Sequence, residues 1–128
     1  MEVNSFGKEN KILIVDDDNS VRDFLVRFLK QKGYRDVRAV GTGQEALDII
    51  KKEDISLVLL DVRLPEMDGL EVLRKIKEIN KDIGVIMITG FPDEAIAKGA
   101  VKEGAYDYII KPFDLAYLEL CVLSKLLQ

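Results

Sequence analysis

The segment KILIVDDD at residues 11–18 is an apolar run that ends in three consecutive aspartates. A near-continuous apolar run of this length is typical of a strand buried on both faces of a parallel sheet. We expect this strand at residues 11–16. Comparable runs predict four further strands, at residues 36–40, 56–61, 84–89 and 106–110.

The segments between these runs carry apolar residues at the spacing of amphipathic helices. After the first strand, Asn19 or Ser20 is positioned to cap a helix and Gly33 to end it. Asp18 is interpreted as a cap or as a group outside the direct ligands of the acidic site. Further helices are predicted over about residues 43–52, around positions 72–79, over 93–103 and over 114–127. Five alternating strand–helix units imply an α/β fold with one five-stranded parallel sheet and helices on both faces.

Length and composition indicate a single globular domain. The chain has 128 residues, of which 48% are hydrophobic and 33% charged, enough for a core without cross-links. Residues 1–9 are expected to be a flexible N-terminal tail and residues 10–128 the domain. The net charge of −4 argues against nucleic-acid binding, and no apolar run is long enough to span a membrane. The first ten residues show no signal or transit pattern, so we expect a cytoplasmic location.

Two features of the composition restrict the chemistry. The sequence contains no histidine, which excludes Ser–His triads and histidine-based zinc sites. It contains one cysteine, Cys121, so no disulfide can form within the chain. A reactive site must therefore be built from carboxylates, hydroxyls, lysine and the backbone.

The carboxyl ends of the predicted strands carry such groups. Residues 16–18 are aspartates after the first strand, Asp61 ends the third, Thr89 ends the fourth, and Lys111 follows the fifth. In an open parallel sheet these ends lie at one edge, where ligands bind. Clustered carboxylates without histidine or cysteine favour a hard cation, Mg²⁺ before Ca²⁺. A carboxylate beside Mg²⁺ and a lysine can accept a phosphoryl group and form an aspartyl phosphate.

Five short motifs, in this order, resemble those of the response-regulator receiver domain of two-component signalling. They are IVDD at 14–17, LLD at 59–61, PEMDG at 65–69, ITG at 88–90 and KPF at 111–113, and the resemblance covers about residues 10–127. It implies a flavodoxin-like, doubly wound (βα)5 fold. It also implies a phosphoacceptor switch rather than an enzyme, with Mg²⁺ as cofactor.

The resemblance assigns roles to residues of the predicted acidic site. Asp61 matches the phosphoacceptor of the family. Asp17 matches the residue that binds Mg²⁺ directly and Asp16 the one that binds it through water, with the backbone carbonyl of Arg63 as a further ligand. Arg63 and Phe91 match positions that flank the approach of hydrolytic water, and their bulk predicts slow self-hydrolysis.

The resemblance also assigns the residues of the switch. Thr89 matches the hydroxyl that moves toward the phosphoryl group, and Lys111 the lysine that pairs with it. Tyr108 matches the aromatic residue that turns inward as that hydroxyl moves. The Lys111–Pro112 peptide bond is expected to be cis, as in the family.

The resemblance implies a partner that carries a histidine, either a histidine kinase or a histidine phosphotransfer protein. The last predicted helix has two neighbouring apolar stripes: Leu115, Leu118, Val122 and Leu126, and beside them Ala116, Leu120, Leu123 and Leu127. Either this helix is set deeply between its neighbours, or it forms a homodimer or partner face with the fifth strand and Tyr108, a frequent output and dimer surface in the family.

Three other interpretations differ in what they require of the sequence. A small Mg²⁺-dependent phosphohydrolase that acts through an aspartyl phosphate would use the same Asp61, but no insertion is long enough for a substrate cap. A flavodoxin-like FMN carrier needs a phosphate-cradling loop after the first strand, where three aspartates would repel phosphate. The segment GTGQEA at 41–46 matches a dinucleotide-binding pattern but follows the second strand, so we interpret it as a turn and helix start.

Overall fold

The computed structural model describes residues 9–112 and 114–127. Within them, five parallel strands form one sheet in the order β2-β1-β3-β4-β5. The strands are β1 (Lys11–Val15), β2 (Asp36–Val40), β3 (Leu57–Asp61), β4 (Gly84–Thr89) and β5 (Asp107–Ile110). The predicted five-stranded parallel sheet is confirmed, and each strand end lies within one residue of the expected position.

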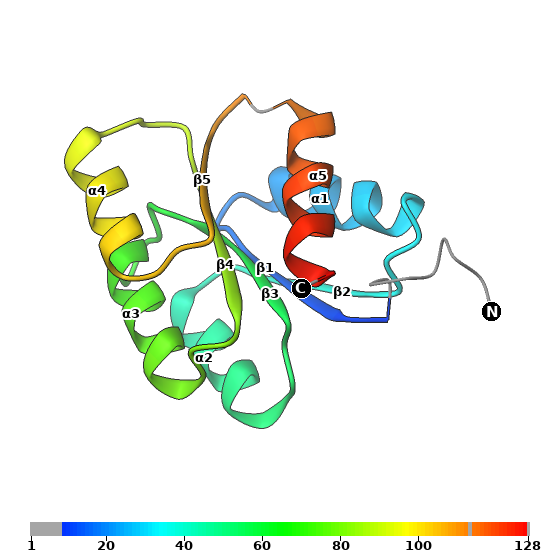
Figure 1. The fold of residues 1–128 in the computed structure, drawn as a ribbon, viewed down its shortest axis with the longest axis horizontal. Helices are drawn as coiled ribbons and strands as arrows, with labels where there is room; N and C mark the ends of the chain where they lie inside the picture. Colours follow the sequence, from blue (N-terminus) through cyan, green and yellow to red (C-terminus); the bar gives the residue numbers. More distant parts are fainter. Residues whose placement is uncertain (1–8, 113, 128) are drawn as a thin grey trace.

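Helices cover both faces of this sheet, as Figure 1 shows. They are α1 (Asn19–Gln31), α2 (Gly43–Lys52), α3 (Gly69–Ile79), α4 (Glu94–Lys102) and α5 (Leu115–Leu126). Helices α1 and α5 cover one face, and α2, α3 and α4 cover the other. The strand order reverses at β1, which lies between β2 and β3, and ligands of open α/β sheets bind beside such a reversal.

The core consists of two apolar layers, one on each face of the sheet. In β1, Ile12 and Ile14 pack with the layer under α1 and α5, while Leu13 and Val15 pack with the layer under α2, α3 and α4. All four side chains are buried, because a strand points successive side chains to opposite faces and both faces are covered. This packing fixes the end of β1, and with it the position of the aspartates that follow.

Helix α1 is capped by one of the three residues considered from the sequence. Its cap is Asp18, whose carboxylate Oδ1 accepts hydrogen bonds from the backbone N–H groups of Ser20 and Val21 at 2.8 and 3.4 Å. The expectation that Asn19 or Ser20 caps this helix is therefore wrong. Asp18, Asn19 and Ser20 all have side chains that suit a cap. Asp18 has the extended backbone conformation that a cap requires, and the helix begins at Asn19. Gly33 follows the helix with φ 99°, as expected of a residue that ends it.

The remaining expectations about the fold concern its ends and one peptide bond. The Lys111–Pro112 bond is cis, as expected. Residues 1–8 of the predicted tail, Phe113 of the KPF motif and Gln128 lie outside the described residues. In the described part, no helix combines the length and apolar character that crossing a bilayer requires.

Candidate functional site

Residues from four separate segments, three of which contribute polar side chains, line a pocket at the carboxyl edge of the sheet. We call it the acid pocket; its volume is about 310 Å³, and its lining includes Asp16, Asp17, Asp61, Arg63, Phe91 and Lys111. The first two of these follow β1, Asp61 ends β3, and Lys111 follows β5. The structure therefore brings together the carboxylates and the lysine that the strand ends predict.

Three carboxylates of the acid pocket are close enough to share one metal ion. One oxygen from each of Asp16, Asp17 and Asp61 lies within 4.8 Å of the others, and theirs is the one such acidic group among the described residues. Mg²⁺ prefers oxygen donors and keeps several of its waters, so one or two of these carboxylates can bind it directly and the remaining one through a bound water. The donor set therefore fits the predicted cofactor.

Lys111 supplies positive charge inside this group of carboxylates. Its Nζ lies 3.0 Å from Asp16 Oδ2 and 3.8 Å from Asp61 Oδ2. The Asp16 carboxylate is almost wholly buried and Lys111 is mostly covered, so solvent screens this interaction less than it screens a surface ion pair. The ammonium group thereby offsets part of the repulsion among the carboxylates.

Asp61 is buried at the end of β3, with its two carboxylate oxygens in different surroundings. Oδ1 accepts a hydrogen bond from the Arg63 backbone N–H at 3.1 Å, and Oδ2 is the oxygen nearest Lys111. Burial, together with the charges of Asp16 and Asp17, raises the pKa of Asp61 to about 6, against the lowering effects of the Arg63 N–H and Lys111. A buried carboxyl group with a raised pKa inside a pocket is typical of a functional site.

Asp16 is held by three hydrogen bonds around the loop from β1 to α1, two to its backbone and one to its carboxylate. Its N–H donates to the Val40 carbonyl at 3.1 Å, and its carbonyl accepts from Arg22 Nη1 at 2.6 Å. Its carboxylate Oδ1 accepts from the Asp18 N–H at 2.9 Å. Arg22 was not found from the sequence, because the spacing of residues in a helix does not show that an arginine side chain turns back to a carbonyl in the preceding loop.

Thr89 ends β4, but its hydroxyl is engaged with the following loop. Thr89 Oγ1 accepts a hydrogen bond from the Phe91 N–H at 3.0 Å and lies 3.3 Å from the Phe91 carbonyl oxygen, to which it can donate. The side chain is fully buried and is not among the residues that line the acid pocket. In this conformation Thr89 is next to the pocket in sequence and in the sheet, without contributing to its surface.

Arg63 and Phe91 stack against each other at the rim of the acid pocket. The guanidinium carbon of Arg63 lies 4.3 Å from the centroid of the Phe91 ring, within the range of a cation–π contact. Both side chains are exposed, and both belong to the pocket lining. The contact links the loop after β3 to the loop after β4.

Tyr108, on β5, does not line the acid pocket. Its ring packs against the apolar layer under α2, α3 and α4, which is an inward position. Its hydroxyl is buried and has no hydrogen-bond partner among the described residues. A buried hydroxyl without a partner costs free energy, so this orientation depends on the packing of the ring.

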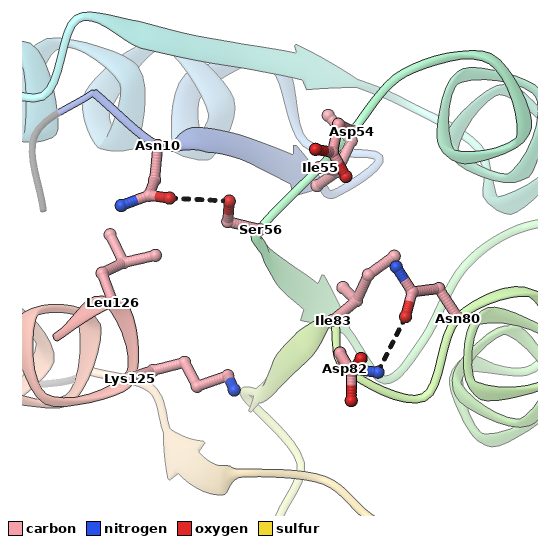
Figure 2. Close-up of a pocket in the computed structure, with 9 residues that line it drawn as sticks. All are labelled: Asn10, Asp54, Ile55, Ser56, Asn80, Asp82, Ile83, Lys125 and Leu126. Carbon is pink, nitrogen blue, oxygen red and sulfur yellow. Dashed lines mark hydrogen bonds between the residues drawn. The ribbon is translucent and has the colours of Figure 1, made fainter. Parts of the chain in front are cut away.

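A second pocket lies at the opposite edge of the sheet, near the start of β3 and β4 (Figure 2). Several of its polar groups are already bonded to one another. Ser56 Oγ donates to Asn10 Oδ1 at 3.0 Å, and the Asp82 N–H donates to Asn80 Oδ1 at 2.9 Å. None of the predicted site residues lines this pocket, so the acid pocket is the candidate functional site.

Comparison with known protein families agrees with the choice of the acid pocket as the candidate functional site. The family model described as the response regulator receiver domain matches residues 12–122. A relative of similar length is the sporulation initiation phosphotransferase F of Bacillus subtilis, which is 40% identical over 105 residues, covering 82% of this chain and 84% of that protein. The chain spans about a quarter of the length of several bacterial transcriptional regulators that it also matches.

Solved structures give the same result for the fold. A response regulator receiver domain protein (CheY-like) from Methanospirillum hungatei has a TM-score of 0.88 at 34% identity, covering 92% of this chain and 94% of that chain. A chain of the CheX-CheY-BeF3-Mg+2 complex from Borrelia burgdorferi has a TM-score of 0.84 at 32% identity, covering 90% of this chain and 87% of that chain. The predicted doubly wound (βα)5 fold is confirmed.

Proposed function

The chain belongs to the family of response regulator receiver domains of two-component systems, and on that premise we propose that Asp61 is its phosphoacceptor. The observation that carries this proposal is the position of Asp61, which is buried beside two further carboxylates and 3.8 Å from the Lys111 ammonium. The family match favours a receiver over a phosphohydrolase, the alternative that uses the same aspartate.

The proposed reaction is the transfer of a phosphoryl group from a phosphorylated imidazole of a partner protein. Asp61 Oδ2 attacks phosphorus, a new O–P bond forms, and the P–N bond breaks with its electron pair left on the imidazole nitrogen. The Arg63 N–H stays on Oδ1, which leaves Oδ2 as the attacking oxygen. The product is an acyl phosphate with close to two negative charges.

We propose that Asp16, Asp17, Asp61 and the Arg63 carbonyl hold Mg²⁺ for this step. When bound, this ion neutralises charge on the transferring oxygens. Lys111 pairs with the phosphoryl oxygens after leaving Asp16, because an added dianion at Asp61 attracts the ammonium group more strongly than one carboxylate does. The similarity to a solved complex that contains CheY, BeF3 and Mg²⁺ supports this role of the site.

The response to phosphorylation is proposed to start at Thr89. Its hydroxyl exchanges its hydrogen bonds with Phe91 for one to a phosphoryl oxygen, because a bond to a charged acceptor is stronger than one to a neutral amide. The inward orientation of Tyr108 is stabilised when Thr89 moves. The equilibrium then shifts over the face formed by α4, β5 and α5.

A groove beside the acid pocket is suited to the partner that carries the histidine. It lies between α1 and the start of α5, has a volume of about 380 Å³, and is lined mainly by apolar groups of Val21, Phe24, Pro112 and Leu115. Lys111 belongs to both the groove and the acid pocket, so a protein seated in the groove reaches Asp61. Replacing Phe24 by serine should slow transfer from a phosphorylated kinase and leave labelling by acetyl phosphate unchanged.

The exposed stripe of α5 is proposed to join two copies of the chain. Leu118 and Val122 of the first predicted stripe are buried, whereas Leu120 and Leu127 of the second are 61% and 49% exposed. Ile110, at the end of β5, is also half exposed. Sedimentation should show a dimer that Leu120→Glu dissociates; a monomer both before and after phosphorylation would exclude this interface.

Labelling with acetyl phosphate tests the phosphoacceptor directly. The intact mass of the protein should increase by one phosphoryl group when Mg²⁺ is present, and the Asp61→Asn variant should gain none. Asp54→Asn is the matched control, since Asp54 is an exposed aspartate at the opposite edge of the sheet. Undiminished labelling of Asp61→Asn would refute the assignment.

A further inference from the structure

We infer that Phe91 is a second switch point, which phosphorylation of Asp61 releases through two residues at once. Its backbone is bonded to the Thr89 hydroxyl, and its ring is stacked on the Arg63 guanidinium. The inference rests on the proposed role of Asp61 as phosphoacceptor. It goes beyond that role by naming Arg63 as a residue that responds to the phosphoryl group.

Few other contacts hold the Phe91 side chain in place. It is 60% exposed and belongs to neither apolar layer of the core. It lies in the segment between the end of β4 at Thr89 and the start of α4, where Asp93 is the cap. The contacts with Thr89 and Arg63 are therefore the ones that the described residues provide to hold Phe91.

Arg63 is placed to reach a phosphoryl group on Asp61. Its backbone N–H already bonds to Asp61 Oδ1 at 3.1 Å, so the two residues are held together, and its side chain lines the same pocket. An arginine pairs with phosphate oxygens through charge-assisted hydrogen bonds, often two at a time. Such a pair is stronger than a cation–π contact at an exposed site. The guanidinium group should therefore leave the ring for the phosphoryl oxygens.

Both contacts of Phe91 are thus lost for the same reason. Thr89 and Arg63 exchange a neutral partner in the loop after β4 for a dianion on Asp61. The segment before α4 then loses the hydrogen bonds of the Phe91 backbone and the cation–π contact of the Phe91 ring. This couples the charge at Asp61 to the start of α4 by a route that does not pass through Tyr108.

Hydrogen exchange at the Phe91 amide tests this inference, because that amide is the donor to Thr89 Oγ1. The exchange rate is measured by NMR with Mg²⁺ alone and with Mg²⁺ and acetyl phosphate. We expect phosphorylation to speed exchange at least several-fold in the parent protein. The Arg63→Gln variant, which keeps the backbone N–H but has no guanidinium, should exchange about two- to fivefold faster than the parent before phosphorylation.

Two controls separate the possible outcomes. Arg74→Gln removes an arginine of α3 that pairs with Glu103 away from the acid pocket, and it should leave exchange at Phe91 unchanged. Intact mass is measured on the same samples. Labelled protein with unchanged exchange at Phe91, or an Arg63→Gln variant that exchanges like the parent, would overturn this inference alone. Protein that takes no label would overturn the phosphoacceptor assignment, and the inference with it.

Discussion

Lys111 Nζ and Asp16 Oδ2, which are 95 residues apart in the sequence, lie 3.0 Å from each other across the acid pocket. The two residues follow β5 and β1, which are separated in the sheet by β3 and β4. The ammonium group thus lies where three carboxylates converge and substitutes for part of the charge that a divalent cation would bring.

Replacing Lys111 by methionine should destabilise the protein, and Mg²⁺ should reverse much of the loss. The variant leaves three clustered carboxylates without their nearest positive charge, at a cost of about 2 kcal/mol in the free energy of unfolding at neutral pH. Mg²⁺ binds only the folded state and restores stability by mass action. Urea unfolding with EDTA and with excess Mg²⁺ measures both effects. An equal loss in the two conditions would contradict the shared role of lysine and cation.

Replacing Asp61 by asparagine should stabilise the protein at neutral pH and have little effect in acid. The pKa of Asp61 is about 6 in the folded state and about 3.8 when unfolded, so the folded state binds more protons between these values. The free energy of unfolding therefore falls as pH rises through this window. The asparagine removes that penalty, which is roughly 1–3 kcal/mol above pH 6. Unfolding is followed in EDTA at neutral pH and at about pH 4; the same effect at both would refute the raised pKa.

Gly69 should not tolerate a side chain, whereas Gly90 should. A Cβ at Gly69 would lie 2.6 Å from the Val62 carbonyl oxygen and 2.7 Å from its Cα, and backbone atoms there cannot move aside cheaply. At Gly90 the nearest atom to a Cβ is Lys111 Cδ, 3.9 Å away. We expect Gly69→Ala to cost about 1–3 kcal/mol and Gly90→Ala less than about 0.5 kcal/mol in thermal unfolding. Equal costs would contradict the close approach of the loop after β3.

Replacing Tyr108 by phenylalanine should stabilise the conformation described here. The variant keeps the packed ring and removes a buried hydroxyl that has no hydrogen-bond partner among the described residues, a gain of about 1 kcal/mol. Tyr106→Phe is the matched control, since the Tyr106 hydroxyl lies 2.7 Å from Ser124 Oγ and its loss should cost about 0.5 kcal/mol. A Tyr108→Phe variant less stable than the parent would indicate that this hydroxyl is satisfied.

The alternation of apolar runs and helical segments was sufficient to predict the sheet and its functional edge. Residues 84–89 and 36–40 match their strands without error, and each run is followed directly by a glycine, Gly90 or Gly41, that favours a turn. The cap of α1 could be narrowed to three residues but not assigned to one, because aspartate, asparagine and serine follow one another and only the backbone path selects Asp18. The burial of α5 was also undecided, since leucines form both stripes and only the neighbouring helices determine that Leu118 is covered and Leu120 is not.

The carboxylates of the site could be predicted and its other contacts could not. Strand ends place Asp16, Asp61 and Lys111 at one edge in any parallel sheet of this order. The bond from Arg22 to the Asp16 carbonyl and the stacking of Arg63 on Phe91 depend on side-chain conformations that no spacing specifies. The first contact helps to position Asp16 in the acid pocket, and the second is the one that we propose responds to phosphorylation of Asp61.

Identification of the modified residue tests the central claim most directly. The protein is labelled with acetyl phosphate and Mg²⁺, the acyl phosphate is reduced with borohydride, and the digest is sequenced by tandem mass spectrometry. Reduction converts a phosphorylated aspartate into homoserine. The account predicts homoserine at position 61 and at no other aspartate; homoserine at position 16 or 17, with Asp61 intact, would contradict it.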